Sequence, residues 1–336
     1  MGLRIGVVTP WAVKCGIYSY SRDLTEALAE LGVESYIVRL PRFGVKIPEV
    51  FNAVAESIPL DKVDLIHVQH EYGLYNNLEA GFYGVLRRLG KPVVTTMHAI
   101  GNWSVDRVIA DASDRVIVHN EFCFRRFAFP ENTSIIPHGC KSVECLPPEE
   151  SRRSLGIPTK APVVGYLGFI SNYKGLEVLI EAMQEIPEAV LLIGGGWHTG
   201  PDTSYIMDLK NRSMEVLAGR CMWLGFVPDE SLPNAYGAMS IVVYPSMFAT
   251  ESGALLTALG HGKAVIANNL PPFKEKEKVN ALITFEGLED LREKIRTLLK
   301  DEELRVSLEA GARTYAEAND WSKIAEKHII LYEDLL

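Results

Sequence analysis

The chain has 336 residues, and at roughly 100 to 200 residues per domain this length favours two domains. Hydrophobic residues make up 47% and charged residues 23%, a globular composition that excludes a disordered, collagen-like or disulfide-scaffold chain. The 34 Lys and Arg residues are outnumbered by 43 Asp and Glu, for a net charge of -9. This acidic balance disfavours nucleic acid as a partner.

The apolar runs are too short for a signal peptide or a membrane span, so we expect a cytoplasmic protein. The five Cys residues are scattered without CxxC or Cys/His spacing, which indicates reduced thiols rather than disulfides or a zinc site. A small basic cluster, Arg87, Arg88 and Lys91, is typical of a solvated helix end. Its alternative is a weak peripheral contact with an anionic inner-membrane surface.

In the first half of the chain, short β-rich runs alternate with amphipathic stretches. Strands are predicted at 3–9, 34–40, 63–69, 92–97, 114–119 and 133–137. The first helix places Leu24 and Leu28 on one face and ends at Gly32. Apolar strands that alternate with helices predict a parallel sheet covered on both faces.

Residues 141–161 are rich in Pro and charge and predict an interdomain linker with about one turn of helix. The alternation then resumes, with strands predicted at 162–168, 189–196, 221–226, 240–246, 263–268 and 281–285. The tail from 287 has a helical pattern broken near Asn319. We therefore predict an α/β fold of two doubly wound, Rossmann-like domains that face a cleft, with domains at 1–145 and 160–315 and a C-terminal helix at about 319–336 that packs back on the first domain.

Ligands of such sheets bind beyond the carboxyl ends of strands, so the loops there are the places to look for chemistry. In GFISNYKGLEVLIEAM, Gly168 ends a strand, and Lys174 and Gly175 precede a helix. Unpaired amides and the positive end of the helix dipole favour a phosphate there, with Lys174 as countercharge. The alternative is a solvated surface lysine.

A second segment, ESGALLTALGHG, also places a helix N-terminus where it could bind a phosphate. Ser252, Gly253 and Ala254 open a helix with small residues that allow a ligand close to the amides, and Glu251 is placed to accept hydrogen bonds from sugar hydroxyls. The alternative is a plain capped helix. Together the two loops predict a nucleotide-diphosphate site, whereas GGGW after another strand lacks the GxGxxG spacing, which disfavours NAD.

In the first domain, Gly16 precedes a helix and is either a ligand-approach glycine or a turn glycine. His98 follows a buried-looking strand and is either catalytic or structural. His70 and Glu71, at another strand end, are expected either to bind acceptor hydroxyls or to pair at a helix start. His119 and His138 are interpreted as structural, and no histidine or DxD spacing predicts a metal site.

These segments, in this order, resemble the retaining, nucleotide-sugar-dependent glycosyltransferases of family four (glycosyl transferases group 1), which have the GT-B fold. VVGYLGFISNYKGLEVLIEAM resembles that family's glycine turn and Lys-Gly motif, and ESGALLTALGHGKAVIA resembles its donor-binding helix. The resemblance implies that Lys174 and Gly16 approach the donor diphosphate, that His98 lies beside the transferred sugar, and that the amides of 252–254 hold phosphate. His98 and Lys174 are the catalytic residues that it predicts.

The chain departs from the family pattern at two places. Phe169 stands where the family usually has Arg, and Ala249 and Thr257 stand where it has paired glutamates, with Glu251 displaced by two positions. The predicted phosphate site has one cation fewer, and ribose recognition falls to Thr257 or another residue.

The expected function is metal-independent, retaining transfer of a hexose from a nucleotide sugar to an acceptor hydroxyl, with no cofactor besides that substrate. The acceptor is a sugar, a lipid-linked molecule or another small molecule. The alternatives are a sugar-nucleotide epimerase or hydrolase, and an inactive or regulatory nucleotide-sugar-binding protein of the same fold.

Overall fold

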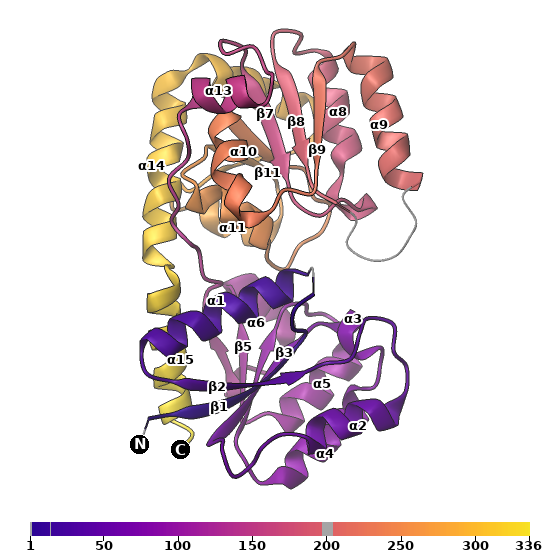
Figure 1. Cartoon of the computed structure of the whole chain (residues 1–336), viewed down its shortest axis with the longest axis vertical. Coiled ribbons are helices and arrows are strands. Elements are labelled where there is room, and N and C mark those ends of the chain that lie inside the picture. Colours follow the sequence, from indigo (N-terminus) through magenta and orange to yellow (C-terminus); the bar gives the residue numbers. More distant parts are fainter. Residues whose placement is uncertain (1, 14, 197–203) are drawn as a thin grey trace. The chain divides into compact units, whose positions relative to one another are not determined.

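The structure is a computed structural model that describes residues 2–13, 15–196 and 204–336. The chain forms two compact units, one made of Met1–Gly139 with Asn319–Leu336 and the other of Cys140–Ala318 (Figure 1). The boundary after Gly139 corrects the predicted end of the first domain at 145. The reason is local, because Cys140 Sγ donates to Leu256 O at 3.0 Å and Val143 N donates to Gly260 O at 2.9 Å, which ties this segment to the second unit.

The first unit contains a six-stranded parallel sheet with strand order β2-β1-β3-β4-β5-β6. Its strands are β1 (Arg4–Thr9), β2 (Glu34–Arg39), β3 (Leu65–His70), β4 (Val93–Met97), β5 (Arg115–Val118) and β6 (Thr133–Ile135). Each of them was predicted from its apolar run. The strand order reverses direction between the neighbours β1 and β3.

Helices cover both faces of this sheet, as predicted for apolar parallel strands. They are α1 (Gly16–Glu30), α2 (Pro48–Glu56), α3 (Tyr72–Tyr75), α4 (Glu79–Leu86), α5 (Trp103–Ala112), α6 (Glu121–Phe127) and α15 (Trp321–Glu333). α1 and α15 lie side by side (Figure 1), and their apolar faces share one core cluster with Ile5 and Val7 of β1. Trp321 of α15 packs so closely on Gly139 that an added Cβ would lie 2.2 Å from the indole ring.

The second unit repeats the architecture with strand order β12-β11-β10-β7-β8-β9, again all parallel. Its strands are β7 (Val163–Leu167), β8 (Val190–Gly194), β9 (Cys221–Gly225), β10 (Ile241–Tyr244), β11 (Val265–Asn268) and β12 (Ile283–Phe285). Here the order reverses between β7 and β10. The prediction of two doubly wound, Rossmann-like units is therefore confirmed.

The helices of the second unit are α7 (Pro148–Ser154), α8 (Leu176–Gln184), α9 (Ser204–Leu217), α10 (Leu232–Ala238), α11 (Gly253–Gly260), α12 (Pro271–Glu277), α13 (Gly287–Lys300) and α14 (Glu302–Ala318). α7 lies inside the segment predicted as a linker and is longer than the single turn expected there. In the described residues, no helix has both the length and the apolar content needed to cross a bilayer. None of the five cysteines is joined to another by a disulfide in the described residues.

The glycines of the GGGW segment have a packing role. Gly195 has φ +150°, and a Cβ on it would lie 1.8 Å from Gly168 O. A Cβ on Gly194 would lie 2.3 Å from Leu167 Cδ2. The absence of side chains lets the ends of β7 and β8 approach each other, while Trp197 of this segment lies outside the described residues.

Candidate functional site

The two loops predicted to hold phosphate follow neighbouring strands of the second sheet. β7 leads into the loop that carries Lys174, and β10 leads into the loop that ends at Ser252. The strand order reverses between these two strands. A reversal of this kind leaves a crevice beyond the carboxyl ends of the strands, which is where doubly wound sheets bind their ligands.

Direct contacts hold the two loops together. Met247 N donates to Tyr173 O at 2.8 Å. The buried Tyr244 hydroxyl lies 3.0 Å from Leu167 O and 2.7 Å from Ala254 O. Gly175 has φ +67°, and a Cβ on it would lie 2.4 Å from Pro245 O, so both the turn and the loop contact require glycine.

Lys174 ends a short 3-10 turn, η3 (Asn172–Lys174), just before α8 begins at Leu176. Its ammonium lies 4.7 Å from the centre of the Tyr173 ring, and Tyr173 is 47% exposed. A lysine next to a helix N-terminus faces the positive end of the helix dipole, which is an unfavourable position unless an anion binds there. The arrangement therefore suits an anionic ligand.

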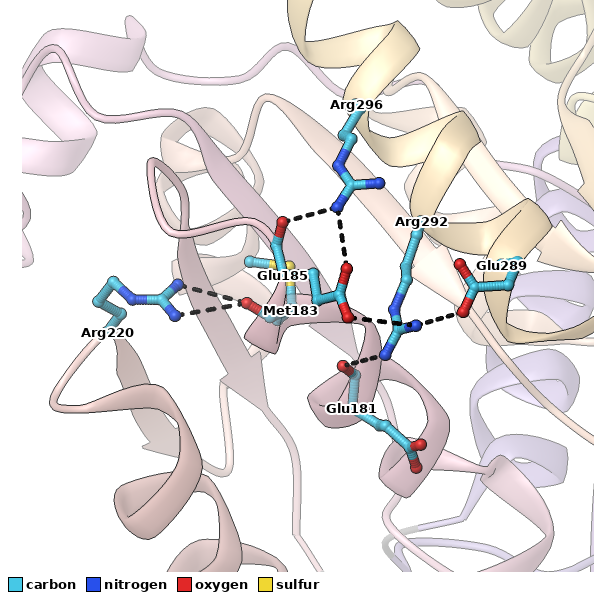
Figure 2. A network of polar contacts seen from close by, with 7 residues as sticks. All are labelled: Glu181, Met183, Glu185, Arg220, Glu289, Arg292 and Arg296. Atoms are coloured by element: carbon cyan, nitrogen blue, oxygen red, sulfur yellow. Dashed lines mark hydrogen bonds and ion pairs between the residues drawn. The ribbon is translucent and has the colours of Figure 1, made fainter.

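Two arginines bind the C-terminal end of α8: Arg220, which directly precedes β9, and Arg296 of α13 (Figure 2). Arg220 donates to Ile186 O at 3.0 Å and Ala189 O at 3.1 Å, and Arg296 donates to Glu185 O at 2.9 Å. These donors satisfy carbonyls at and after the helix end and complement its negative dipole end. α8 is thereby fixed at one end while its N-terminal amides face the loop of Lys174.

α11 begins directly after the second loop. Ser252 is its N-cap, and its buried hydroxyl accepts a hydrogen bond from Leu255 N at 3.3 Å. The amides of Gly253 and Ala254 have no acceptor within the helix by its geometry. Gly253 is exposed, so a ligand can reach these amides. Ser252, Gly253 and Ala254 therefore open a helix, as predicted.

Glu251 lies in a different environment from the one expected of a sugar-binding carboxylate. Its Oε2 accepts from Lys276 Nζ at 2.8 Å, and its Oε1 accepts from Ser252 N at 2.9 Å. The side chains of Lys276 and Glu251 are only 3% and 6% exposed. Burial lowers the pKa of Lys276, but the Glu251 carboxylate outweighs this and raises that pKa overall. This geometry favours a structural role for Glu251.

The positions where the chain departs from the family pattern also have local partners. Thr257 Oγ1 donates to Gly253 O at 2.8 Å along α11. Phe169 O accepts from the Tyr166 hydroxyl at 2.8 Å, and Ala249 packs against the core of the second unit. Gly168, with φ +157°, joins β7 to this loop. None of these contacts supplies a second cation next to Lys174.

In the first unit, Gly16 and His98 follow β1 and β4. Gly16 is the first residue of α1 and is exposed, with Cys15 as N-cap. His98 Nε2 lies 2.9 Å from Gln69 Oε1, and His98 Nδ1 lies 3.4 Å from His119 Nε2. Burial, followed by neighbouring histidines, lowers the pKa of His98 well below its usual value, so its ring is neutral.

The structure favours the structural alternative for His70 and Glu71. His70 is fully buried, stacks on Tyr75 and has its Nε2 3.2 Å from Glu79 Oε1. Glu71 is the N-cap of α3 and accepts from Gly73 N at 2.9 Å. Within the described residues, no three or more His, Cys, Asp or Glu side chains are grouped so that they could hold a metal ion.

Sequence reasoning missed two sets of polar residues. Lys276 was not linked to Glu251, since 25 residues separate them and only tertiary structure brings them together. His67 and Gln69, two polar residues at alternate positions of the buried strand β3, were also not identified from the sequence. Their period of two places both on one face, which is a signal that the sequence did contain.

Gly16→Ala is expected to leave stability unchanged or to raise it by about 0.4–1 kcal/mol, because an added Cβ meets no atom within 4 Å. If a ligand approaches the N-terminal amides of α1, the same methyl group should weaken sugar-nucleotide binding about fivefold or more, the equivalent of about 1 kcal/mol. Titration calorimetry and thermal unfolding measure the two effects. Gly84→Ala in α4, where a Cβ also meets nothing within 4 Å, is the matched control. Equal affinities in both variants would assign Gly16 to the turn alone.

Solved structures with the same fold were found over the full chain. Sucrose-phosphate synthase from Thermosynechococcus elongatus has a TM-score of 0.78 at 21% identity and covers 99% of both chains. HepE from Anabaena, in complex with UDP and glucose, has a TM-score of 0.81 at 17% identity and covers 99% of this chain and 100% of its own. At these identities the likeness establishes the fold, and the predicted GT-B class is confirmed.

Similar sequences are named glycosyltransferases. D-inositol 3-phosphate glycosyltransferase of Corynebacterium jeikeium is 30% identical over 198 residues, which are 56% of this chain and 47% of that protein. Sulfoquinovosyl transferase SQD2 of Arabidopsis thaliana is 31% identical over 183 residues, 52% of this chain and 34% of its own. The chain spans about half the length of the curated relatives it matches. Residues 148–315, half of the chain, match the model of the family Glycosyl transferases group 1, and the chain belongs to this family.

Proposed function

We propose that the protein is a retaining glycosyltransferase that binds a nucleotide-diphosphate sugar in its second unit and an acceptor hydroxyl in its first. The observation that carries this proposal is that two strand-to-helix loops, each leading to a helix N-terminus, contact each other at the strand-order reversal of the second sheet. One N-terminus has Lys174 beside it, and the other opens with Ser252 and Gly253. Amides, helix dipoles and one ammonium group together suit a diphosphate.

In the proposed reaction, the bond between the sugar's anomeric carbon and the diphosphate breaks while a bond to the acceptor oxygen forms on the same face. The acceptor proton passes to the leaving diphosphate. Negative charge grows on that diphosphate in the transition state, where Lys174 and the amides of Gly253 and Ala254 stabilise it by fixed electrostatics. His98 is proposed to contact the transferred sugar. Gly168 and Thr257 complete the donor loops, and Glu251 acts by holding the loop before α11.

The donor and acceptor classes are proposed from the relatives. HepE was solved with UDP and with UDP-glucose, so a uridine diphosphate sugar is the first donor to test. One relative is named a D-inositol 3-phosphate glycosyltransferase, so a polyol phosphate is the first acceptor to test, followed by the sugars and lipid-linked molecules expected from the sequence. A front-face reaction of this kind keeps the anomeric configuration of the donor in the product.

Incubation of the full chain with a panel of UDP, GDP and ADP sugars, with and without these acceptors, tests the proposal. Nucleotide release that depends on acceptor, with a product of retained configuration, is the expected result. Release that is equal without acceptor would identify a hydrolase, and a changed sugar still attached to the nucleotide would identify an epimerase. Binding without any turnover would identify a binding protein, an alternative that Phe169, Ala249 and Thr257 at the family's Arg and Glu positions favour.

Donor binding is expected to survive a chelator, because the described residues contain no ligand cluster for a metal. Lys174 and helix amides are proposed to neutralise the diphosphate in place of a divalent ion. The measurement is donor affinity before and after EDTA treatment, and again with Mg²⁺ restored. A loss of binding that Mg²⁺ reverses would contradict metal independence.

A further inference from the structure

A chain of polar side chains crosses the carboxyl-end half of the first sheet. It begins at Tyr332 on α15, whose hydroxyl lies 2.7 Å from His67 Nδ1 on β3. His67 Nε2 lies 2.8 Å from Thr96 Oγ1 and 3.2 Å from the carboxamide of Gln69. Tyr332, His67, Thr96 and Gln69 are all fully buried, so their polar groups depend on one another for hydrogen bonds.

The chain continues through residues that follow the next strands. The Gln69 carboxamide lies 2.9 Å from His98 Nε2, beyond β4, and His98 Nδ1 lies 3.4 Å from His119 Nε2, beyond β5. His119 Nδ1 ends the chain 3.1 Å from Ile136 O, beyond β6. From Gln69 onward, these links join residues on or just after adjacent strands, in the sheet order β3-β4-β5-β6.

The direction of the hydrogen bonds that link Tyr332 to Ile136 through His67, Gln69, His98 and His119 follows from the carbonyl at the end of the chain. Ile136 O only accepts, so a neutral His119 carries its proton on Nδ1 and accepts on Nε2. The 3.4 Å contact between His119 Nε2 and His98 Nδ1 is then a hydrogen bond only if His98 donates from Nδ1, and this tautomer leaves His98 Nε2 as an acceptor. The donor to this nitrogen is the Gln69 carboxamide, through its NH₂ group.

The remaining links have the same direction. With the NH₂ group of Gln69 toward His98, its carbonyl oxygen faces His67, so His67 donates from Nε2 and accepts from the Tyr332 hydroxyl on Nδ1. This assignment exchanges the oxygen and the nitrogen of the Gln69 carboxamide relative to the orientation with Oε1 toward His98. The two ends of a carboxamide have nearly the same shape, so the hydrogen-bond network determines which orientation is correct. The opposite orientation either places two nitrogen lone pairs face to face across the His98–His119 contact or puts an extra proton on one of the two rings, a charge that burial opposes.

We propose that Gln69 and His119 are positioning residues that hold His98 as the neutral Nδ1–H tautomer, within a one-directional hydrogen-bond chain that runs from Tyr332 to Ile136 O. The 3.4 Å link between His98 and His119 is longer than an ordinary hydrogen bond of about 2.7–3.2 Å. The Nδ1–H group of His98 is therefore the member of the chain that can turn its bond toward a ligand hydroxyl. The effect on sugar transfer rests on the proposed function, whereas the tautomer does not.

Nitrogen-15 NMR of the histidines in the full-length, ligand-free protein tests the tautomers directly. Near pH 7.5, His98 and His119 are expected as neutral Nδ1–H rings and His67 as a neutral Nε2–H ring. A cationic His98, or a neutral His98 protonated on Nε2, would overturn the proposal. This measurement needs no substitution and stands even if no donor or acceptor is turned over.

Gln69→Glu tests the role of the carboxamide, because a carboxylate of the same shape accepts hydrogen bonds but cannot donate one to His98 Nε2. His98 is then expected to gain a proton on Nε2, visible in the same spectrum. Transfer should slow by about tenfold, the worth of one hydrogen bond of about 1.4 kcal/mol, with donor KM within twofold of wild type. Gln184→Glu, at the exposed end of α8, is the matched control and should change neither property.

Three outcomes distinguish the positioning role of Gln69 from the proposed sugar transfer. An unchanged His98 tautomer in Gln69→Glu would overturn the positioning role, even in an active enzyme. A changed tautomer with an unchanged transfer rate would also overturn it. Absence of transfer in the wild type, with the predicted tautomers present, would contradict the proposed function alone.

Tyr332→Phe, which keeps the packing of the ring, should shift the His67 Nδ1 resonance, and an unshifted resonance would contradict the assigned start of the chain.

Discussion

Lys174→Ala is expected to weaken nucleoside-diphosphate binding by about ten- to a hundredfold. The ammonium group lies in the loop before α8, with Phe169 where the family has a second cation. A charge-assisted hydrogen bond is worth about 1.5–3 kcal/mol, which corresponds to that loss of affinity. Because charge grows on the diphosphate as the glycosidic bond breaks, turnover should fall by more than ground-state binding.

The stability of the second unit should barely change in this variant, since the lysine faces the positive end of a helix dipole and gains little from the fold itself. Lys210→Ala is the matched control, because Lys210 also lies over an aromatic ring, 5.7 Å from the centre of Trp223, but on α9. Titration calorimetry with a nucleoside diphosphate and transfer rates would be measured for both. Equal affinities and rates in the two variants would show that Lys174 is a solvated surface lysine.

Lys276→Met is expected to cause the largest loss of stability, about 3–5 kcal/mol, because it leaves the buried Glu251 carboxylate without its cation. For a unit of this size that is a drop of roughly 10 °C in thermal midpoint. The pKa of Lys276 is raised in the folded state. The pair's contribution is therefore complete below the unfolded pKa of about 10.4 and is lost only as pH rises through the still higher folded pKa. The deficit should be constant across neutral pH.

Two further variants separate the ion pair from general effects on α12. Lys274→Met, on the exposed side of the same helix, should leave the midpoint nearly unchanged. Glu251→Gln combined with Lys276→Met should recover part of the lost stability, because no charge then remains buried. If Glu251 instead binds the ribose, Glu251→Gln would weaken nucleotide binding at temperatures where the protein is fully folded, and the structural assignment would be wrong.

The fold could be predicted because its signals are local. Runs such as residues 163–167 and 241–244 are apolar throughout, as strands covered on both faces must be. The loops of Lys174 and Ser252 could be proposed as one site because strand-to-helix turns of one doubly wound sheet share an edge. Their adjacency at β7 and β10 required the strand order, which no single segment contains.

The individual roles of polar side chains were less predictable. His70 and His98 both follow apolar strands in the sequence, yet His70 has no exposed surface and pairs with Glu79, while His98 lies in a chain that ends at Ile136 O. Glu251 differs from an exposed carboxylate only through Lys276, which comes from another helix. Such partners are set by tertiary packing, and a sequence pattern at one strand end does not distinguish them.

The central claim is that the diphosphate of the donor binds where α8 and α11 begin. Hydrogen–deuterium exchange of the full chain, with and without saturating UDP, GDP or ADP, tests it most directly, since amides that bind phosphate exchange more slowly. Slower exchange at residues 174–178 and 252–256, reduced in Lys174→Ala at the same nucleotide concentration and retained in Lys210→Ala, is the predicted result. Nucleotide binding that protects other segments while these two exchange at their unliganded rates would contradict it.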